Sequence, residues 1–183
     1  MTGDSDLIGL SISAIERKCN LYKIAVIGLS TNTEIVMPPL RGMKVGQVSR
    51  LALVGKKESV EKFCAKHDLT IRSRLRRFVD VLNPMRSGFA EVVIPPGSPL
   101  IGSEMSELHM RRRFKVQVLS VFRKNRYFKG SSMKQLKVQA GDTLGVFSEW
   151  QALRTMQKQS EFAVVTTDFP KEKELPQIGR AHV

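Results

Sequence analysis

The tripeptide Leu7-Ile8-Gly9 recurs as Leu100-Ile101-Gly102, at an offset of 93 positions along the chain. Other apolar residues pair at the same offset, in order along the chain: Ile12 with Met105, Ile15 with Leu108, Leu51 with Leu144, Leu53 with Val146, and Val60 with Leu153. Between them, residues 22–26 match residues 114–118 after a slip of one position, and Gly46 matches Gly141 after a slip the other way. An ordered series of this kind indicates an internal repeat. The sequence therefore predicts two homologous domains, at about 5–68 and 90–170.

Each repeat carries the same order of predicted elements. A short helix follows the Leu-Ile-Gly turn, with Ser11 or Ser103 as its N-cap, and Met105 and Leu108 share one face of the second of these helices. The alternation of β-branched residues then predicts a strand, a polar hairpin turn and a return strand, followed by a third strand. These strands cover 23–29, 34–37 and 51–54 in the first repeat and 116–123, 127–129 and 143–147 in the second. A closing helix places Val60 and Phe63, or Leu153 and Met156, inward, and an extra strand over 91–94 opens the second repeat.

These elements predict an α+β fold of two tandem small sandwiches, each with about three or four mostly antiparallel strands and two helices. The first domain is expected at 1–68, a basic helical connector at 69–88, the second domain at 89–170 and a linker tail at 171–183. Helical spacing of Leu75, Phe78, Val79 and Leu82 before Asn83-Pro84 supports the connector helix. Domains of this size bury little core alone, so we expect pairing within one chain or between chains, as in a homodimer.

The charge of the chain is its unusual bulk property. Its 183 residues include 30 Lys and Arg against 17 Asp and Glu, a net charge of +13. Such a balance indicates an anionic partner: nucleic acid, an anionic membrane face or a phosphorylated ligand. The chain shows neither a run of roughly 18–20 apolar residues nor a signal sequence. With only Cys19 and Cys64 as cysteines, these features predict a soluble cytoplasmic protein in a reduced compartment.

Several motifs together resemble a known family. Ser98-Pro99-Leu100-Ile101-Gly102, the turn Arg113-Phe114-Lys115, the strand over 116–123 and Ala140-Gly141-Asp142 are similar to the TrkA-C domain, the C-terminal lobe of RCK (regulator of potassium conductance) proteins. The first repeat is similar too, but has Ser5-Asp6 in place of Ser-Pro and Gly46-Gln47 in place of Gly-Asp. The tandem arrangement, with Glu91–Gly97 ahead of the second copy, resembles the cytoplasmic insert of bacterial divalent anion:sodium symporters.

This resemblance implies a non-catalytic, regulatory or ligand-sensing module of a membrane ion transporter. It places the module at the cytoplasmic face of the inner membrane, with the membrane-embedded part of the transporter as its partner. A separate regulatory subunit of a potassium uptake system is an alternative. A basic nucleic-acid-binding protein is an alternative of another class, motivated by the charge alone.

The resemblance also implies a ligand site. Some TrkA-C domains bind a cyclic dinucleotide or a similar small anionic effector in the cleft between paired copies, near the corner between helix and strand. The corresponding positions in this sequence are Arg112, Arg113, Phe114, Lys115 and Val116. Guanidinium groups bind phosphate in a bidentate manner, and an aromatic ring stacks on a base. The alternative interpretation is structural: the arginines stabilise a helix C-terminus and Phe114 belongs to the core.

Other chemistry finds no support in the sequence. The chain contains neither a Gly-x-Gly-x-x-Gly turn nor a Walker-type phosphate loop, so we expect no NAD or ATP site and no other cofactor. Cys64 and His67 lie three positions apart on a predicted helix, but zinc usually needs three or four ligands, so we expect no metal site. His109, beside Leu108 in the predicted short helix, is expected at a surface or interface. We find no recognisable catalytic grouping and predict no enzymatic activity.

Overall fold

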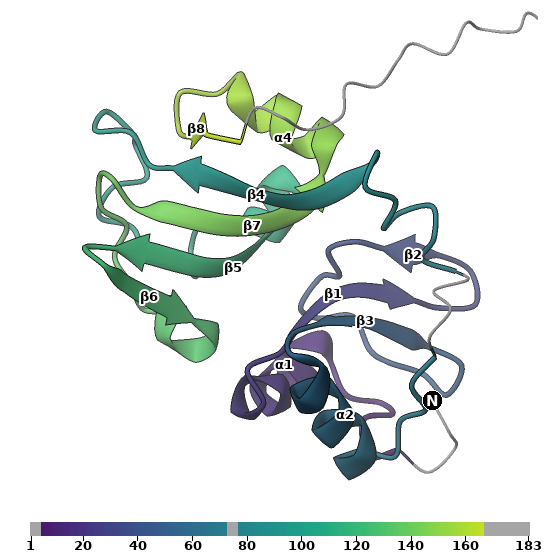
Figure 1. Cartoon of the computed structure of the whole chain (residues 1–183). Coiled ribbons are helices and arrows are strands. Elements are labelled where there is room, and N and C mark those ends of the chain that lie inside the picture. The colour runs from purple at the N-terminus through teal and green to yellow at the C-terminus, as the bar shows by residue number, and fades with distance from the viewer. Residues whose placement is uncertain (1–4, 73–76, 167–183) are drawn as a thin grey trace, which may run out of the picture.

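The computed structural model describes residues 5–72 and 77–166 of the chain. Figure 1 shows two antiparallel sheets, each with its own helices, that lie side by side and are joined by the segment between them. The predicted α+β fold is confirmed.

In chain order the first unit contains α1 (Ile12–Leu21), β1 (Ala25–Ser30), β2 (Ile35–Val36), β3 (Arg50–Val54) and α2 (Lys57–Lys66). The second contains β4 (Ser87–Val93), α3 (Met110–Phe114), β5 (Val116–Arg123), β6 (Arg126–Lys129), the 3-10 turn η1 (Gly130–Met133), β7 (Thr143–Glu149), α4 (Trp150–Gln157) and β8 (Ala163–Val164).

The first unit is a three-stranded sheet in the order β2-β1-β3, covered on one face by α1 and α2. Ser11 caps α1 as predicted, because its Oγ accepts a hydrogen bond from the backbone N–H of Ala14 at 3.3 Å. The apolar face of α1 buries Ile12, Ile15 and Cys19 against the sheet and against Phe63 of α2. Burial of this face stabilises the helix more than its intrinsic propensity does.

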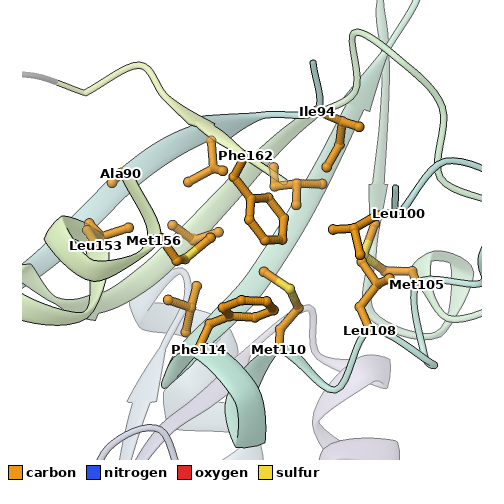
Figure 2. Packing of buried hydrophobic residues seen from close by; sticks show 14 of the residues in the cluster. Ala90, Ile94, Leu100, Met105, Leu108, Met110, Phe114, Leu153, Met156 and Phe162 are labelled. Carbon is orange, nitrogen blue, oxygen red and sulfur yellow. The ribbon is translucent and has the colours of Figure 1, made fainter. Parts of the chain in front are cut away.

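The second unit is a five-stranded sheet in the order β6-β5-β7-β4-β8. The strand predicted over 116–123 has those bounds as β5, whereas the extra strand predicted over 91–94 begins earlier, at Ser87. The sheet packs its inner face against α4 and α3, and Figure 2 shows Leu153 and Met156 of α4 beside Phe114 and Phe162 in this core.

The two units share their backbone hydrogen bonds at an offset of 93. The N–H of Gly9 donates to the carbonyl of Val45 at 2.7 Å, and the N–H of Gly102 donates to the carbonyl of Val138 at 2.9 Å. Gly9 and Gly102 both have a positive φ, at +82° and +91°, which is the conformation that glycine adopts without strain. The strand pair β1–β3 has a bulge between residues 26 and 28, and β5–β7 has one at the equivalent place, between residues 118 and 120.

The predicted match of Gly46 with Gly141 is wrong by two positions. The N–H of Gly46 donates to Ser49 Oγ at 2.9 Å, and the N–H of Gln139 donates to Asp142 Oδ2 at the same distance. Gly46 is therefore equivalent to Gln139, and Ser49 to Asp142, which keeps the offset of 93 through this turn. Matching the two glycines implied a slip of two positions that the hydrogen bonds do not show.

The short helix predicted after Ser103 is also wrong. Residues 105–108 form turns, and α3 begins only at Met110, because His109 adopts a left-handed backbone conformation with φ +47°. His109 therefore lies before the helix rather than within it. Met105 and Leu108 are nevertheless buried in the core, so the inward spacing of these two residues is satisfied without a helix.

The connector helix predicted over 69–88 is absent from the described part of that segment, 69–72 and 77–86. Two isolated i to i+4 hydrogen bonds remain of the helical pattern, from the N–H of Leu82 to the carbonyl of Phe78 and from the N–H of Ser87 to the carbonyl of Asn83. Phe78 is buried between the sheets, beside Gly28 of β1, and this packing decides the local structure. Leu75, Arg74 and Arg76 lie outside the described residues, as does the predicted linker tail at 171–183.

The outer faces of the two sheets meet through a small apolar cluster. Ile27 and Ala52 of the first unit and Phe147 of the second are buried in it, with Phe78 of the connecting segment between them. Since Phe147 pairs with Gln117 across the sheet, this contact brings the start of β5 to the junction of the two units. The junction is where the candidate site lies.

Candidate ligand site at the junction of the two units

A cavity of about 940 Å³ lies at the junction, and both units contribute to its walls. From the first unit come parts of α1, β1 and β3, and from the second come α3, β5 and the segment from β6 through η1. Its ionisable lining is strongly one-sided, with one acidic side chain against six basic ones: Glu16 against Lys23, Arg41, Arg111, Arg112, Lys129 and Lys134. A concave surface with this charge concentrates anions.

Glu16 of α1 neutralises part of this charge and links the units. Arg41 places its Nε 3.5 Å from Glu16 Oε2, and Arg111 of α3 makes a close ion pair with Glu16 Oε1. Arg111 also donates to the carbonyl oxygen of Pro39 at 2.9 Å. Arg111 therefore joins the second unit to the first through two acceptors. One carboxylate shared by two guanidinium groups leaves a net positive charge in this part of the wall.

Lys134 shows the effect of this crowding of cations. Burial lowers the pKa of its ammonium group, and the nearby charge of Arg41 lowers it further, followed by Arg17 and Arg111, while Glu16 acts in the opposite direction. A cation held among cations is destabilised relative to its neutral form, and a bound anion would relieve that repulsion. The electrostatics of the wall thus favour an anionic ligand.

Gln117 of β5 adds an unsatisfied hydrogen-bond acceptor to the cavity wall. Its side chain is only 3% exposed, and its Oε1 has no hydrogen-bond partner within the described part of the chain. A buried acceptor without a partner costs about 1–3 kcal/mol, so such groups usually have a role. An N–H or O–H group of a ligand would satisfy this oxygen.

The five residues predicted as a ligand site form one corner of the second unit but have different surroundings. Phe114 and Val116 are buried, and Phe114 meets Phe162 edge to face at 5.1 Å between ring centroids (Figure 2). Arg113 lies over the Phe114 ring and pairs with Glu161 at 3.1 Å. Lys115 is exposed and left-handed, with φ +58°. Arg112 is exposed and lines the cavity, so it is the predicted residue that the structure brings to the junction.

Several cavity residues were missed by the sequence reasoning. Arg111 belongs to the run of three arginines, Arg111–Arg113. The left-handed conformation of His109 sets where α3 begins, and therefore which of these arginines reaches the first unit. Arg41 and Lys134 lie in turns far apart in the sequence. Gln117 carried one signal: it is the polar residue in an otherwise apolar strand segment, Val116–Leu119, and matches Ala25 in the first unit.

The described residues contain no group of three or more His, Cys, Asp or Glu side chains placed to hold a metal ion. Within 5–72 and 77–166, no helix is both long and apolar enough to cross a membrane.

The corner between α3 and β5 lines the basic cavity through Arg111, Arg112 and Gln117. Residues 89–160, which include this corner, match the family model of the TrkA-C domain. TrkA-C domains are regulatory folds rather than enzymes. The search of the curated proteins found no relative of the chain.

Two solved structures are among those similar to the chain. One is the RCK_C domain dimer of S. agalactiae BusR in complex with c-di-AMP, at 13% identity and a TM-score of 0.35, covering 41% of this chain and 89% of that one. The other is S. agalactiae BusR in complex with its busAB-promotor DNA, at 12% identity and a TM-score of 0.35. That match covers 54% of this chain and 42% of the other, so this chain spans less than half of that protein.

Proposed function

We propose that the chain is a non-catalytic regulatory module in which two TrkA-C units of one chain hold a small anionic effector in the cavity at their junction. In this proposal the first unit is a divergent second copy of the domain matched at 89–160. The recurrence of hydrogen bonds at an offset of 93 and the bulge at the same place in both sheets support it. The observation that carries the proposal is the composition of the cavity wall, which has six basic side chains and one acidic side chain.

A cyclic dinucleotide is the effector we propose. Its two phosphates match the guanidinium groups of the wall, which bind phosphate by charge-assisted hydrogen bonds. Its bases carry N–H groups that can donate to Gln117 Oε1, which has no hydrogen-bond partner among the described residues. The exposed ring of Tyr127 also lines the cavity and offers a surface on which a base can stack.

The effector is tested by isothermal titration with a panel of cyclic dinucleotides and mononucleotides. We predict that Arg112→Ala weakens binding roughly 10-fold or more, the loss of one charge-assisted hydrogen bond of about 1.5–3 kcal/mol. Arg113→Ala is the matched control: it removes the same group from the neighbouring position, where Arg113 is already paired with Glu161. We expect that control to change the affinity less than threefold. No heat with any member of the panel, or equal losses for the two variants, contradicts the proposed site.

The larger setting that we propose is the cytoplasmic face of the inner membrane, as part of an ion transporter of the divalent anion:sodium symporter type. The net charge of +13 supports it, since each basic residue near an anionic leaflet gains about 1 kcal/mol. Flotation with phosphatidylglycerol vesicles, compared with phosphatidylcholine vesicles, at about 150 mM salt tests the membrane attachment. Equal recovery with both lipids would count against it. A regulatory subunit of a potassium uptake system would share the effector site but would not require this attachment.

Nucleic-acid binding is the competing function that the charge supports. Electrostatic attachment to phosphate backbones weakens steeply with salt. Filter binding of duplex DNA and of single-stranded RNA at about 50 mM and about 150 mM salt separates the two functions. Retention that persists at the higher salt and depends on sequence would favour nucleic acid over the small effector.

A further inference from the structure

Two cations at equivalent positions of the two units face the cavity together. The N–H of Ser13 donates to the carbonyl of Arg41 at 2.9 Å, and the N–H of Ser106 donates to the carbonyl of Lys134 at 3.1 Å. Arg41 and Lys134 are therefore equivalent at the offset of 93, and both line the cavity. Burial, and then the positive charge of Arg41, lower the pKa of the Lys134 ammonium group, so the two cations lie close enough to repel each other.

Glu16 of α1 is the acidic side chain that offsets these cations. Its Oε1 makes a close ion pair with Arg111, its Oε2 lies 3.5 Å from Arg41 Nε, and its charge also acts on Lys134. The residue 93 positions further on, His109, lines the cavity too but has no carboxylate. Among the cavity residues that the structure describes, one carboxylate therefore holds the place where three cations converge. A phosphate group would favour the same place, because guanidinium groups bind both kinds of anion in the same manner.

Arg111 has a second anchor that does not depend on Glu16. Its Nη1 donates to the carbonyl oxygen of Pro39 at 2.9 Å, and this bond keeps the guanidinium group in position when the carboxylate leaves. Its Nη2, the atom that pairs with Glu16, can then donate to another acceptor. A glutamate side chain has several rotatable bonds, so its carboxylate can swing toward solvent without a shift of α1. The cations are thus held in place, while the anion among them is exchangeable.

We propose that Glu16 is an internal competitor of the effector, a role that rests on the proposed function: its carboxylate occupies the phosphate position of the cavity, and a phosphate group must displace it to bind. The competition lowers the apparent affinity of the cavity by the fraction of chains in which Glu16 is paired. It also couples binding to the junction. The link from α1 to α3 through Glu16 and Arg111 is exchanged for a link through the ligand.

The variant Glu16→Gln tests this competition with two probes, pyrophosphate and a cyclic dinucleotide, each titrated by calorimetry at about 150 mM salt. We expect both to bind at least about tenfold more tightly to Glu16→Gln than to the native chain, because the amide leaves the guanidinium groups without an anion. Glu58→Gln removes an exposed carboxylate from α2 and is the matched control for the change in net charge. We expect it to change either affinity less than about twofold, since salt screens a distant charge.

Further variants separate competition from a structural role. Arg41→Gln should weaken pyrophosphate binding more in the Glu16→Gln background than in the native chain, where Glu16 already neutralises Arg41. Glu16→Asp keeps the charge but shortens the reach to Arg111, so pyrophosphate should bind it with an intermediate affinity. A structural role alone predicts the opposite sign, since loss of the link between the units would weaken both probes.

The two probes distinguish failure of this role from failure of the proposed function. Pyrophosphate binding that is equal or weaker in Glu16→Gln, or additive effects of Glu16→Gln and Arg41→Gln, overturns the competition and leaves the cyclic dinucleotide as the effector. Tighter binding of pyrophosphate, without binding of any cyclic dinucleotide, overturns the proposed effector and keeps the role of Glu16. Silence of both probes with every variant overturns both.

Discussion

Asp142 is a carboxylate with no solvent exposure, and its partners explain how the second unit tolerates it. Oδ1 accepts a hydrogen bond from Arg123 Nε and Oδ2 accepts one from its Nη2, both at 2.6 Å. Oδ2 also accepts the N–H of Gln139. The hydrogen bond to Asp142 raises the pKa of Arg123 further above its ordinary value. The first unit builds the same turn with a neutral hydroxyl, Ser49, so the ion pair belongs to the second unit alone.

We predict that Arg123→Thr lowers the free energy of unfolding by about 3–5 kcal/mol, because it leaves a buried carboxylate without its cation. Adding Asp142→Ser reproduces the residues that the first unit has at these places, Thr31 and Ser49, and should recover part of the loss. Urea unfolding of the two single variants and the double variant measures the coupling. A double variant less stable than Arg123→Thr would contradict the role assigned to the pair.

Asp6 makes the stability of the first unit depend on pH. Burial alone would raise the pKa of its carboxyl group, but hydrogen bonds from Lys18 and His67, at 3.0 and 2.7 Å, lower it below the ordinary value. A carboxyl group whose pKa is lower in the folded state contributes stability above its unfolded pKa, and this is lost as the pH falls through the folded pKa.

We therefore predict that the melting temperature of the chain falls between roughly pH 4 and pH 2, and that Asp6→Asn makes this fall shallower. Glu34→Gln is the control, since it removes an exposed carboxylate from the same unit. Thermal melts followed by circular dichroism across this range decide the matter. Parallel curves for the native chain and Asp6→Asn would rule out Asp6 as a source of the acid dependence.

At the scale of elements, η1 contacts α1 across the junction through Gly130. Gly130 has φ +60°, and a Cβ added there would lie 2.5 Å from Asn20 Oδ1. Gly141 has a similar positive φ of +81°, but nothing lies within 4 Å of the Cβ it would gain. The two glycines therefore share a left-handed backbone conformation, and they differ in one contact between the units.

We predict that Gly130→Ala destabilises the chain more than Gly141→Ala. Each substitution should cost about 1 kcal/mol for the left-handed conformation, and Gly130→Ala should cost more because Asn20 must move. Denaturant unfolding of both variants gives the difference. Equal losses would mean that the contact between Asn20 and Gly130 contributes nothing to the junction.

The elements differ in how well local pattern predicts them. β5 was predicted with its observed bounds because β-branched and aromatic residues recur from Val116 to Phe122 and polar turn residues follow at Arg123. The connector failed because Phe78 and Leu82 have helical spacing for another reason: they pack between two sheets. The cavity could not be predicted at all, since Arg41, Arg111 and Lys134 converge only when both units are placed.

At the scale of the whole molecule, both cysteines are buried in the first unit, so the reactivity of their thiols measures how readily that unit opens. Burial raises the pKa of the Cys19 thiol to about 12, with a smaller contribution from Glu16, and burial also raises the pKa of Cys64. Since the thiolate is the reactive form, both thiols should label slowly in the native chain.

We predict that Arg111→Ala, which removes the link to Glu16 and Pro39, increases the rate of thiol labelling several-fold, because the first unit then opens more easily. Arg113→Ala is the control within the same helix, since Arg113 bonds to Glu161 of its own unit. The labelling is followed by the colour released from a disulfide reagent at about pH 8. Identical rates for the two variants would show that the junction does not stabilise the first unit.

The cavity described above has walls from two different parts of a single polypeptide, α1 and β1 on one side and α3, β5 and η1 on the other. In a pocket shared by two identical subunits, any mutation in the gene appears on both walls at once. Here one codon changes one wall and leaves the opposite wall intact. Evolution can therefore change the two walls separately, toward binding a ligand whose two ends are chemically unlike.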